Sequence, residues 1–135
     1  MLDTNIFLRG LLNPKSRCSR LLEEVAHRYI LVMSPALIQE ILEVLQRPWL
    51  RRKYPRLERL DLSRLLALFE QAEVVEPEAV PAVCRDPDDD PILACAAQGQ
   101  ADCLITEDLD LLDLGAHQGT RICRPGEFLA RLEEA

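Results

Sequence analysis

The sequence predicts an α/β fold, a three-layer α/β/α sandwich in which helices cover both faces of a central parallel sheet of about four or five strands. Short apolar runs of strand length alternate with amphipathic helices along the chain, a pattern typical of parallel sheets. The 135 residues, 48% of them hydrophobic, suffice for one compact core, so we expect a single domain over residues 1–135. The 9 prolines and 5 glycines are spread out, which disfavours a disordered or fibrous chain.

Helix and strand signals alternate in the first half of the chain. Ser34-Pro35 supplies an N-cap and a proline at the first helical position, and Pro48 stops the helix that follows. Asn13-Pro14 separates two shorter amphipathic helices, and the continuous apolar run 29–33 has the length of a buried strand. We therefore expect a strand end at 1–3, helices at 6–12 and 16–25, a strand at 29–33, and helices at 35–47 and from about Asp61 to Gln71.

The second half of the chain continues the alternation after a proline-rich stretch, 77–87. Asp88, Asp89 and Asp90 form an acidic cap before Pro91, and Gly99 closes the alanine-rich helix that follows them. We expect strands at 73–76, 102–105 and 121–123, and helices at 92–98, 107–112 and 125–134.

Composition limits the compartment in which the protein works. No apolar run approaches the roughly 18 residues of a membrane span, and the N-terminus lacks the pattern of a secretory signal. No C-x-x-C pair occurs, so we expect five free, reduced thiols, at Cys18, Cys84, Cys95, Cys103 and Cys123. These features predict a cytoplasmic protein without membrane partners.

The charge is distributed unevenly. The chain carries a net charge of −7, which argues against a general nucleic-acid coat protein, yet the stretch from Arg47 to Arg64 holds seven bases and only two acids. This stretch is a candidate for RNA binding through Arg47, Arg51, Arg52 and Lys53. A solvated helical face explains the same pattern equally well.

Acidic residues follow the predicted strands. Asp3 ends the first strand, Asp108 comes three residues after the end of the strand 102–105, and Glu40 lies on the helix after the strand 29–33. In open parallel sheets, sites form beyond the carboxyl ends of the strands, so these acids are expected to meet at one rim, with the acidic cap before Pro91. Carboxylates without a histidine or cysteine partner suit Mg²⁺ or Mn²⁺.

Each acid also has a purely structural interpretation. Asp3 and Asp108 can cap the helices that follow them, Asp89 and Asp90 can act as capping acids before Pro91, and Glu40 can be a solvated helix residue. The joint arrangement of the acids, rather than any one of them, favours a metal site.

Four sequence blocks resemble the PIN-domain family. They occur in the family's order along nearly the whole chain, and the match is closest to the prokaryotic, VapC-like branch described as toxin components of toxin–antitoxin systems. The blocks are Leu2-Asp3-Thr4-Asn5-Ile6, Ser34-x5-Glu40-x2-Glu43-x-Leu45-x-Arg47-Pro48, Arg85-Asp86-Pro87-Asp88-Asp89-Asp90 and Ala101-Asp102-x3-Thr106-Glu107-Asp108-x-Asp110-Leu111-Leu112.

The resemblance implies a PIN-like, Rossmann-like fold and a ribonuclease that hydrolyses phosphodiester bonds with Mg²⁺ or Mn²⁺. It implies that Asp3, Glu40 and Asp108 bind the metal. The family's usual spacing back from Thr106 selects Asp89 as the fourth ligand, and Asp90 is the alternative because other branches have a segment one residue shorter. Asn5 and Thr106 match positions that support the ligands through hydrogen bonds.

The resemblance also implies partners: an RNA substrate, an antitoxin protein and a second copy of the chain, because PIN-like proteins commonly pair. The leucine-rich helices at Leu60–Phe69 and Phe128–Leu132 are consistent with a homodimer. Two features depart from the family: only two apolar residues precede Asp3, so the first strand is short or the chain starts upstream, and Glu107 adds a negative charge. The alternative function is a catalytically weak or inactive PIN-like module that binds protein or RNA.

Overall fold

The structure is a computed structural model that describes residues 1–59 and 62–134. Its strands are β1 Val32–Met33, β2 Glu73–Val74, β3 Cys103–Ile105, β4 Ala116–His117 and β5 Thr120–Cys123. Its α-helices are α1 Thr4–Leu12, α2 Arg17–Leu22, α3 Pro35–Leu45, α4 Pro48–Lys53, α5 Leu62–Gln71, α6 Asp90–Gln98, α7 Leu109–Leu112 and α8 Pro125–Glu134. Short 3₁₀ turns are found at Ala26–Arg28, Pro55–Arg59 and Pro87–Asp89.

The predicted single sheet of four or five parallel strands is not shown by the described residues. Strands β1 and β2 form one parallel pair, whereas a second sheet has the order β3-β5-β4, with β3 parallel to β5 and β4 antiparallel to it. Leu2 adds an isolated parallel bridge to Ile105. The reason is length: strands of two to four residues support few ladder bonds each, so the pairings stay separate. The antiparallel strand β4 was not predicted.

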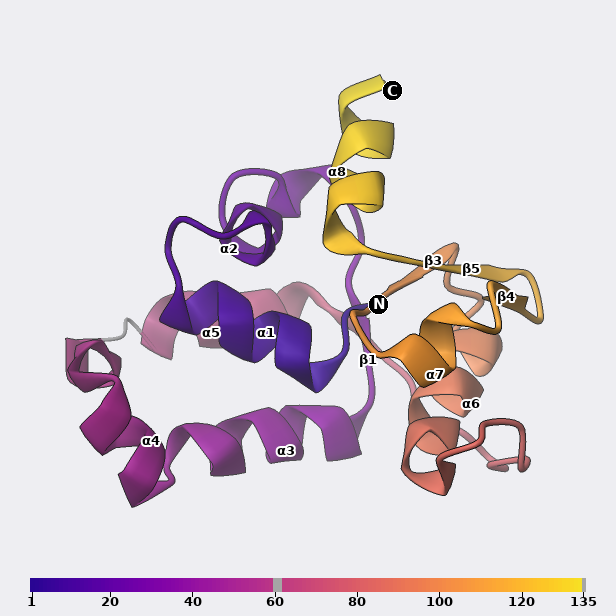
Figure 1. Ribbon diagram of the computed structural model, residues 1–135, viewed down its shortest axis with the longest axis horizontal. Coiled ribbons are helices and arrows are strands. Elements are labelled where there is room, and N and C mark those ends of the chain that lie inside the picture. The colour runs from indigo at the N-terminus through magenta and orange to yellow at the C-terminus, as the bar shows by residue number, and fades with distance from the viewer. Residues whose placement is uncertain (60–61, 135) are drawn as a thin grey trace.

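The layers place the strands between two groups of helices. Figure 1 shows α1, α2, α3 and α5 together on one side of β1, with α6 and α7 on the other side and α8 beyond β3 and β5. The buried core runs between these groups; its largest fully buried side chains include Phe7, Leu21, Met33, Ile41 and Leu104. The α/β class and the alternation of elements predicted from the sequence are therefore confirmed, although the sheet is smaller than predicted.

Helix starts agree well with the capping signals. The Leu37 amide donates to Ser34 Oγ over 3.1 Å and Pro35 begins α3, as predicted. Helix α3 ends at Leu45, and Pro48 begins a separate helix, α4, that carries Arg51, Arg52 and Lys53 in its last turn. Proline suits the first position of a helix as well as the stop of the previous one.

Several element boundaries differ from the prediction. Only the last two residues of the run 29–33 form a strand, because Tyr29 instead turns its hydroxyl to the Leu21 carbonyl. Helix α6 begins at Asp90 rather than 92, and α7 begins at Leu109 rather than 107 because Asp108 serves as its N-cap. The predicted helix start at Asp61 and dimer-helix start at Leu60 lie outside the described residues.

Helices α1 and α2 approach each other closely at Gly10. A Cβ atom at this position would lie 2.7 Å from Leu22 Cδ1 and 2.9 Å from the Cys18 carbonyl oxygen, so only glycine fits. This contact holds α1 in place and thereby fixes Asp3, which precedes the helix. Within residues 1–59 and 62–134, every helix is too short or too polar to cross a membrane.

Candidate metal-binding site

Asp3 sits at the N-terminus of α1 and is 9% exposed. Its Oδ1 accepts a hydrogen bond of 3.0 Å from the Ile6 amide, and its Oδ2 accepts one from the Thr106 hydroxyl. Burial raises the pKa of Asp3, while the hydrogen bonds from Thr106 and Ile6 oppose that shift. Asp3 therefore both caps α1, as its structural interpretation held, and faces the predicted site.

Thr106 connects two of the predicted acids. The residue is fully buried, its hydroxyl donates to Asp3, and the same oxygen accepts the Asp108 amide over 3.0 Å. The Thr106 amide donates to the Cys123 carbonyl over 3.0 Å, which ties this turn to β5. Thr106 thus occupies the place of a supporting residue between Asp3 and Asp108.

Asp108 and Glu40 reach the site from different elements. The Asp108 Oδ1 accepts the Asp110 amide over 2.9 Å at the start of α7. Glu40 lies on α3 and is exposed, and its Oε2 accepts a hydrogen bond of 3.1 Å from the Thr4 hydroxyl on α1. Thr4 thereby holds the Glu40 carboxylate beside the first turn of α1.

Asp89 has an uncompensated carboxylate oxygen. Its Oδ2 is buried and has no hydrogen-bond partner within the described part of the chain. Burial raises the pKa of Asp89 to about 7, and the adjacent Asp108 carboxylate adds to the shift, with smaller repulsion from Asp86 and Asp110. Such a group carries a charge only when a cation or a proton donor compensates it.

Asp90 performs a different task from Asp89. Its Oδ1 accepts the Val83 amide over 3.0 Å and the Cys84 amide over 2.8 Å, and the side chain is 6% exposed. These backbone hydrogen bonds lower the pKa of Asp90. Asp90 therefore anchors the proline-rich loop, and it does not line the cavity described next, unlike Asp89.

The four predicted acids line one cavity of about 380 Å³. Asp3 and Asn5 enter it from the start of α1, Glu40 from α3, Asp89 from the turn before α6, and Asp108 from the start of α7. Exposed Asp88 lines it as well, and Ser34 and Leu37 come from the start of α3. Elements far apart in the sequence thus deliver carboxylates to a single hollow.

Two acids of the neighbourhood were missed by sequence reasoning. One carboxylate oxygen each from Asp86, Asp89 and Asp110 lie within 4.8 Å of one another. Arg85 pairs with Asp110 at 2.9 Å and also with Asp113, so part of this charge is compensated. The signal was present, since Asp86 and Asp110 belong to the quoted blocks, but neither was assigned a role.

A second cavity of about 770 Å³ shares one wall with the first. Asp3, Asn5 and Asp108 line both cavities, and Arg9, Tyr54 and Glu107 line only the second. Glu107, which departs from the family pattern, pairs with Arg9 at 3.9 Å and with Arg124. Its charge is therefore partly neutralised beside the acids.

The predicted RNA-binding bases lie near this second cavity but do not line it. Arg47, Arg51, Arg52 and Lys53 are exposed, and Lys53 Nζ lies 5.6 Å from the ring centroid of Tyr54, a residue of the cavity wall. Arg51 Nε also donates to the Leu45 carbonyl over 3.3 Å. The bases thus border the approach to the acids from the side of α4.

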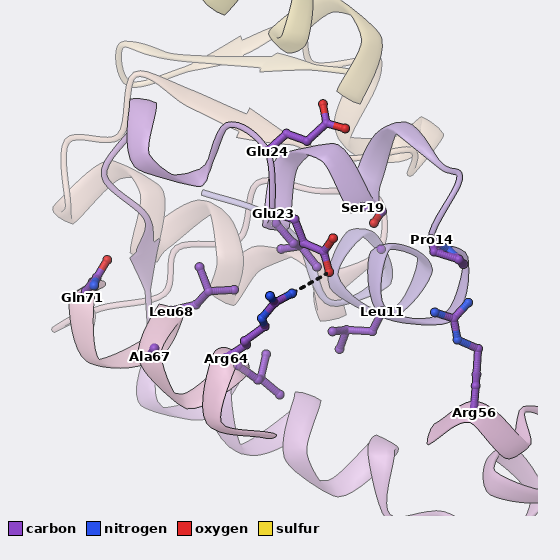
Figure 2. A pocket seen from close by; sticks show the side chains of 13 residues that line it. Leu11, Pro14, Ser19, Glu23, Glu24, Arg56, Arg64, Ala67, Leu68 and Gln71 are labelled. Atoms are coloured by element: carbon purple, nitrogen blue, oxygen red, sulfur yellow. Dashed lines mark ion pairs between the residues drawn. The ribbon is translucent and has the colours of Figure 1, made fainter. Parts of the chain in front are cut away.

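A third cavity, of about 800 Å³, lies between α1, α2 and α5 and contains none of the predicted residues. Figure 2 shows leucine side chains along its walls and the ion pair between Arg64 and Glu23, which spans 3.9 Å. Its lining is mainly apolar and offers no cluster of carboxylates, so the chemistry predicted from the sequence belongs to the acidic cavity alone.

The acidic residues fit a hard divalent cation. Every charged donor in the 380 Å³ cavity is a carboxylate, which is the ligand type that Mg²⁺ and Mn²⁺ prefer. The buried Oδ2 of Asp89 lacks a partner, and several like charges meet in one hollow. A cation would satisfy both deficits.

Comparisons with known proteins agree with this arrangement. A family model described as PIN domain matches residues 1–110. The chain is 32% identical over 115 residues to the uncharacterized protein MJ1680 of Methanocaldococcus jannaschii, an alignment that covers 84% of this chain and 73% of that protein. No solved structure gives a significant match. PIN domains are generally nucleases that use divalent metals, and the chain belongs to the PIN domain family.

Proposed function

We propose that this protein is an Mg²⁺- or Mn²⁺-dependent endoribonuclease that hydrolyses RNA through Asp3, Glu40, Asp89 and Asp108. The observation that carries the proposal is that these four carboxylates line one cavity, in which the buried Asp89 Oδ2 has no partner among the described residues. Family membership supports a nuclease, and the all-carboxylate lining supports the cation class.

The protein's contribution to catalysis is to orient and charge its carboxylates. A bound divalent cation supplies Lewis-acid polarisation of the scissile phosphate. Thr106 fixes the rotamer of Asp3 through its hydroxyl, and the Asp110 amide fixes Asp108. Thr4 holds Glu40 at the opposite wall. These hydrogen bonds preorganise the oxygens, so that little reorganisation is needed when the substrate binds.

RNA rather than duplex DNA is the substrate that we propose. The acids lie in an open hollow that a splayed, single-stranded backbone can enter, and the neighbouring cavity presents Arg9 and the ring of Tyr54. The bases of α4 border that cavity and offset the net charge of −7 locally. Single-stranded RNA would therefore pass from α4 across Tyr54 to the acids.

The finer biological assignment is also a proposal. We propose a toxin component of a toxin–antitoxin system that acts in the cytoplasm as a homodimer and is neutralised by an antitoxin protein. The resemblance of the four sequence blocks to the VapC-like branch supports it. A monomer mass in light scattering at micromolar concentrations would contradict the dimer.

Cleavage of a labelled single-stranded RNA tests the enzymatic proposal. We expect wild-type activity with Mg²⁺ or Mn²⁺, none with EDTA, and a loss of two or more orders of magnitude in Asp108→Asn. Asparagine caps helices as well as aspartate does, so α7 is retained. The matched control is Asp102→Asn, which removes the same charge from an exposed residue outside the acidic cavity.

Two results would contradict the proposal. Equal cleavage by wild type and Asp108→Asn would remove Asp108 from the site. Cleavage that survives EDTA in wild type would refute the cation dependence. Tight metal binding without cleavage of any RNA would instead favour the alternative, an inactive PIN-like binding module.

A further inference from the structure

Two thiols face each other on neighbouring strands away from the acids. Cys103 begins β3 and Cys123 ends β5, and the register pairs Cys103 with Arg121 and Ile105 with Cys123. Side chains two residues apart on a strand share one face, so Cys103 and Cys123 are diagonal neighbours on the same face of the sheet. The two thiols are close enough to hydrogen-bond.

A cavity of about 450 Å³ gives solvent access to Cys103. It is lined by Cys103, Arg121 and Arg131 together with the last turn of α8. Arg131 Nη1 lies 3.6 Å from Cys103 Sγ, within hydrogen-bond distance of a sulfur acceptor. Cys123, in contrast, is 1% exposed and lies behind Cys103. One thiol is therefore accessible and the other is held in reserve.

The surroundings favour the thiolate at Cys103 and disfavour it elsewhere. The hydrogen bond from Cys123 lowers the pKa of Cys103 to about 6, and the Arg131 guanidinium lowers it further against the opposing effects of burial and Asp102. The pKa of Cys123 is raised by the same contact. Burial raises the pKa of Cys84 to about 11. Cys103 is thus chemically distinct from its neighbours.

We propose that Cys103 and Cys123 form a peroxide-reactive thiol pair, in which Cys103 is oxidised first and Cys123 then closes a disulfide with it. In the first step the Cys103 thiolate attacks one peroxide oxygen, the O–O bond breaks, and the leaving hydroxide takes up a proton to become water, so Cys103 becomes a sulfenic acid. In the second step Cys123 sulfur attacks Cys103 sulfur, and the S–O bond breaks. The Cys123 proton leaves with the hydroxyl group as water.

Arg131 is a positioning residue in this proposal. Its guanidinium attracts the thiolate and stabilises the negative charge that develops on the departing peroxide oxygen. The chemistry needs neither a divalent cation nor RNA, so it is independent of the nuclease proposal. It goes beyond the sequence prediction, which treated all five cysteines alike as free thiols.

The test uses the reduced full-length chain and hydrogen peroxide at pH 7. Samples are quenched over time with an alkylating reagent, digested without reduction and analysed by mass spectrometry. We expect Cys103 to be consumed about tenfold or more faster than Cys84, and a peptide pair linked through Cys103 and Cys123 to accumulate. In Cys123→Ser, a dimedone adduct should mark a sulfenic acid that persists on Cys103.

A charge-matched pair of variants tests the role of Arg131. Arg131→Gln should slow the oxidation of Cys103 several-fold, whereas Arg20→Gln removes an equal charge that contacts α8 through Glu133 and should leave the rate unchanged. Equal oxidation of all five cysteines in wild type, or a sulfenic acid that persists on Cys103 without a disulfide, would overturn the proposal. The wild-type measurement stands even if a variant fails to fold.

Discussion

Replacing Asp89 with asparagine should stabilise the cation-free protein, and the gain should depend on pH. The folded-state pKa of about 7 lies roughly three units above the ordinary value of 3.8. At about 1.4 kcal/mol per unit, the upper limit of the stability cost of ionising Asp89 is about 4 kcal/mol. The side chain is partly exposed, so we expect about 2 kcal/mol.

The sign follows from proton linkage. Between pH 4 and 7 the folded protein keeps a proton on Asp89 that the unfolded chain has lost, so the wild type loses stability as pH rises through this window. The asparagine variant has no such proton. The melting temperature of Asp89→Asn should therefore match that of wild type near pH 4 and exceed it by about 6 °C at pH 8, at about 3 °C per kcal/mol.

Thermal unfolding with EDTA between pH 4 and pH 8.5 measures this difference. The matched control is Asp88→Asn, which removes the same charge from the exposed neighbouring residue and should show little pH dependence. Saturating Mn²⁺ should reverse the order, because a ligand of the folded state at a hundred times its Kd adds about 2.7 kcal/mol to wild type. A constant difference between Asp89→Asn and wild type at every pH would refute the reasoning.

Three further outcomes follow from the contacts. Thr106→Val should preserve volume but lose about 1–3 kcal/mol in denaturant unfolding and abolish RNA cleavage, because the buried Asp3 oxygen loses its donor; full activity would contradict this. Asp90→Ala should cost about 2–4 kcal/mol by freeing two loop amides, and an unfolding midpoint equal to that of wild type would exclude this anchoring role. Gly10→Ala should lower Tm by about 3–9 °C through its clash with Leu22 and Cys18, whereas Gly126→Ala, which meets only the flexible Arg17 side chain, should be tolerated; equal melting of the two variants would oppose the packing argument.

The features that were predictable from the sequence are those encoded within a few residues. Ser34 and Asp3 cap the helices that follow them, and both caps depend on contacts to the third residue onward. The rim of acids was predictable because chain order alone places Asp3 and Asp108 after strands. The sheet was not, because pairings such as that of Val32 with Glu73 depend on non-local geometry and on strands only two residues long.

Neighbouring acids could not be told apart by spacing. Asp89 and Asp90 are adjacent, yet one faces the cavity and the other holds the loop at 83–84, because the turn before α6 directs their side chains differently. The approach of Asp86 to Asp110 requires the proline-rich stretch to fold back toward α7. Neither periodicity nor motif order contains that information.

The capping role of Asp3 determines how the protein can be disarmed without being unfolded. Because one carboxylate starts α1 and also faces the cavity, its loss would weaken the fold together with the chemistry. Glu40 carries no such double duty, since it is exposed and its described contact is the Thr4 hydroxyl. A folded but inactive form, whether made for crystallising a substrate complex or arising in nature, is therefore reached with less damage by changing Glu40 than by changing Asp3.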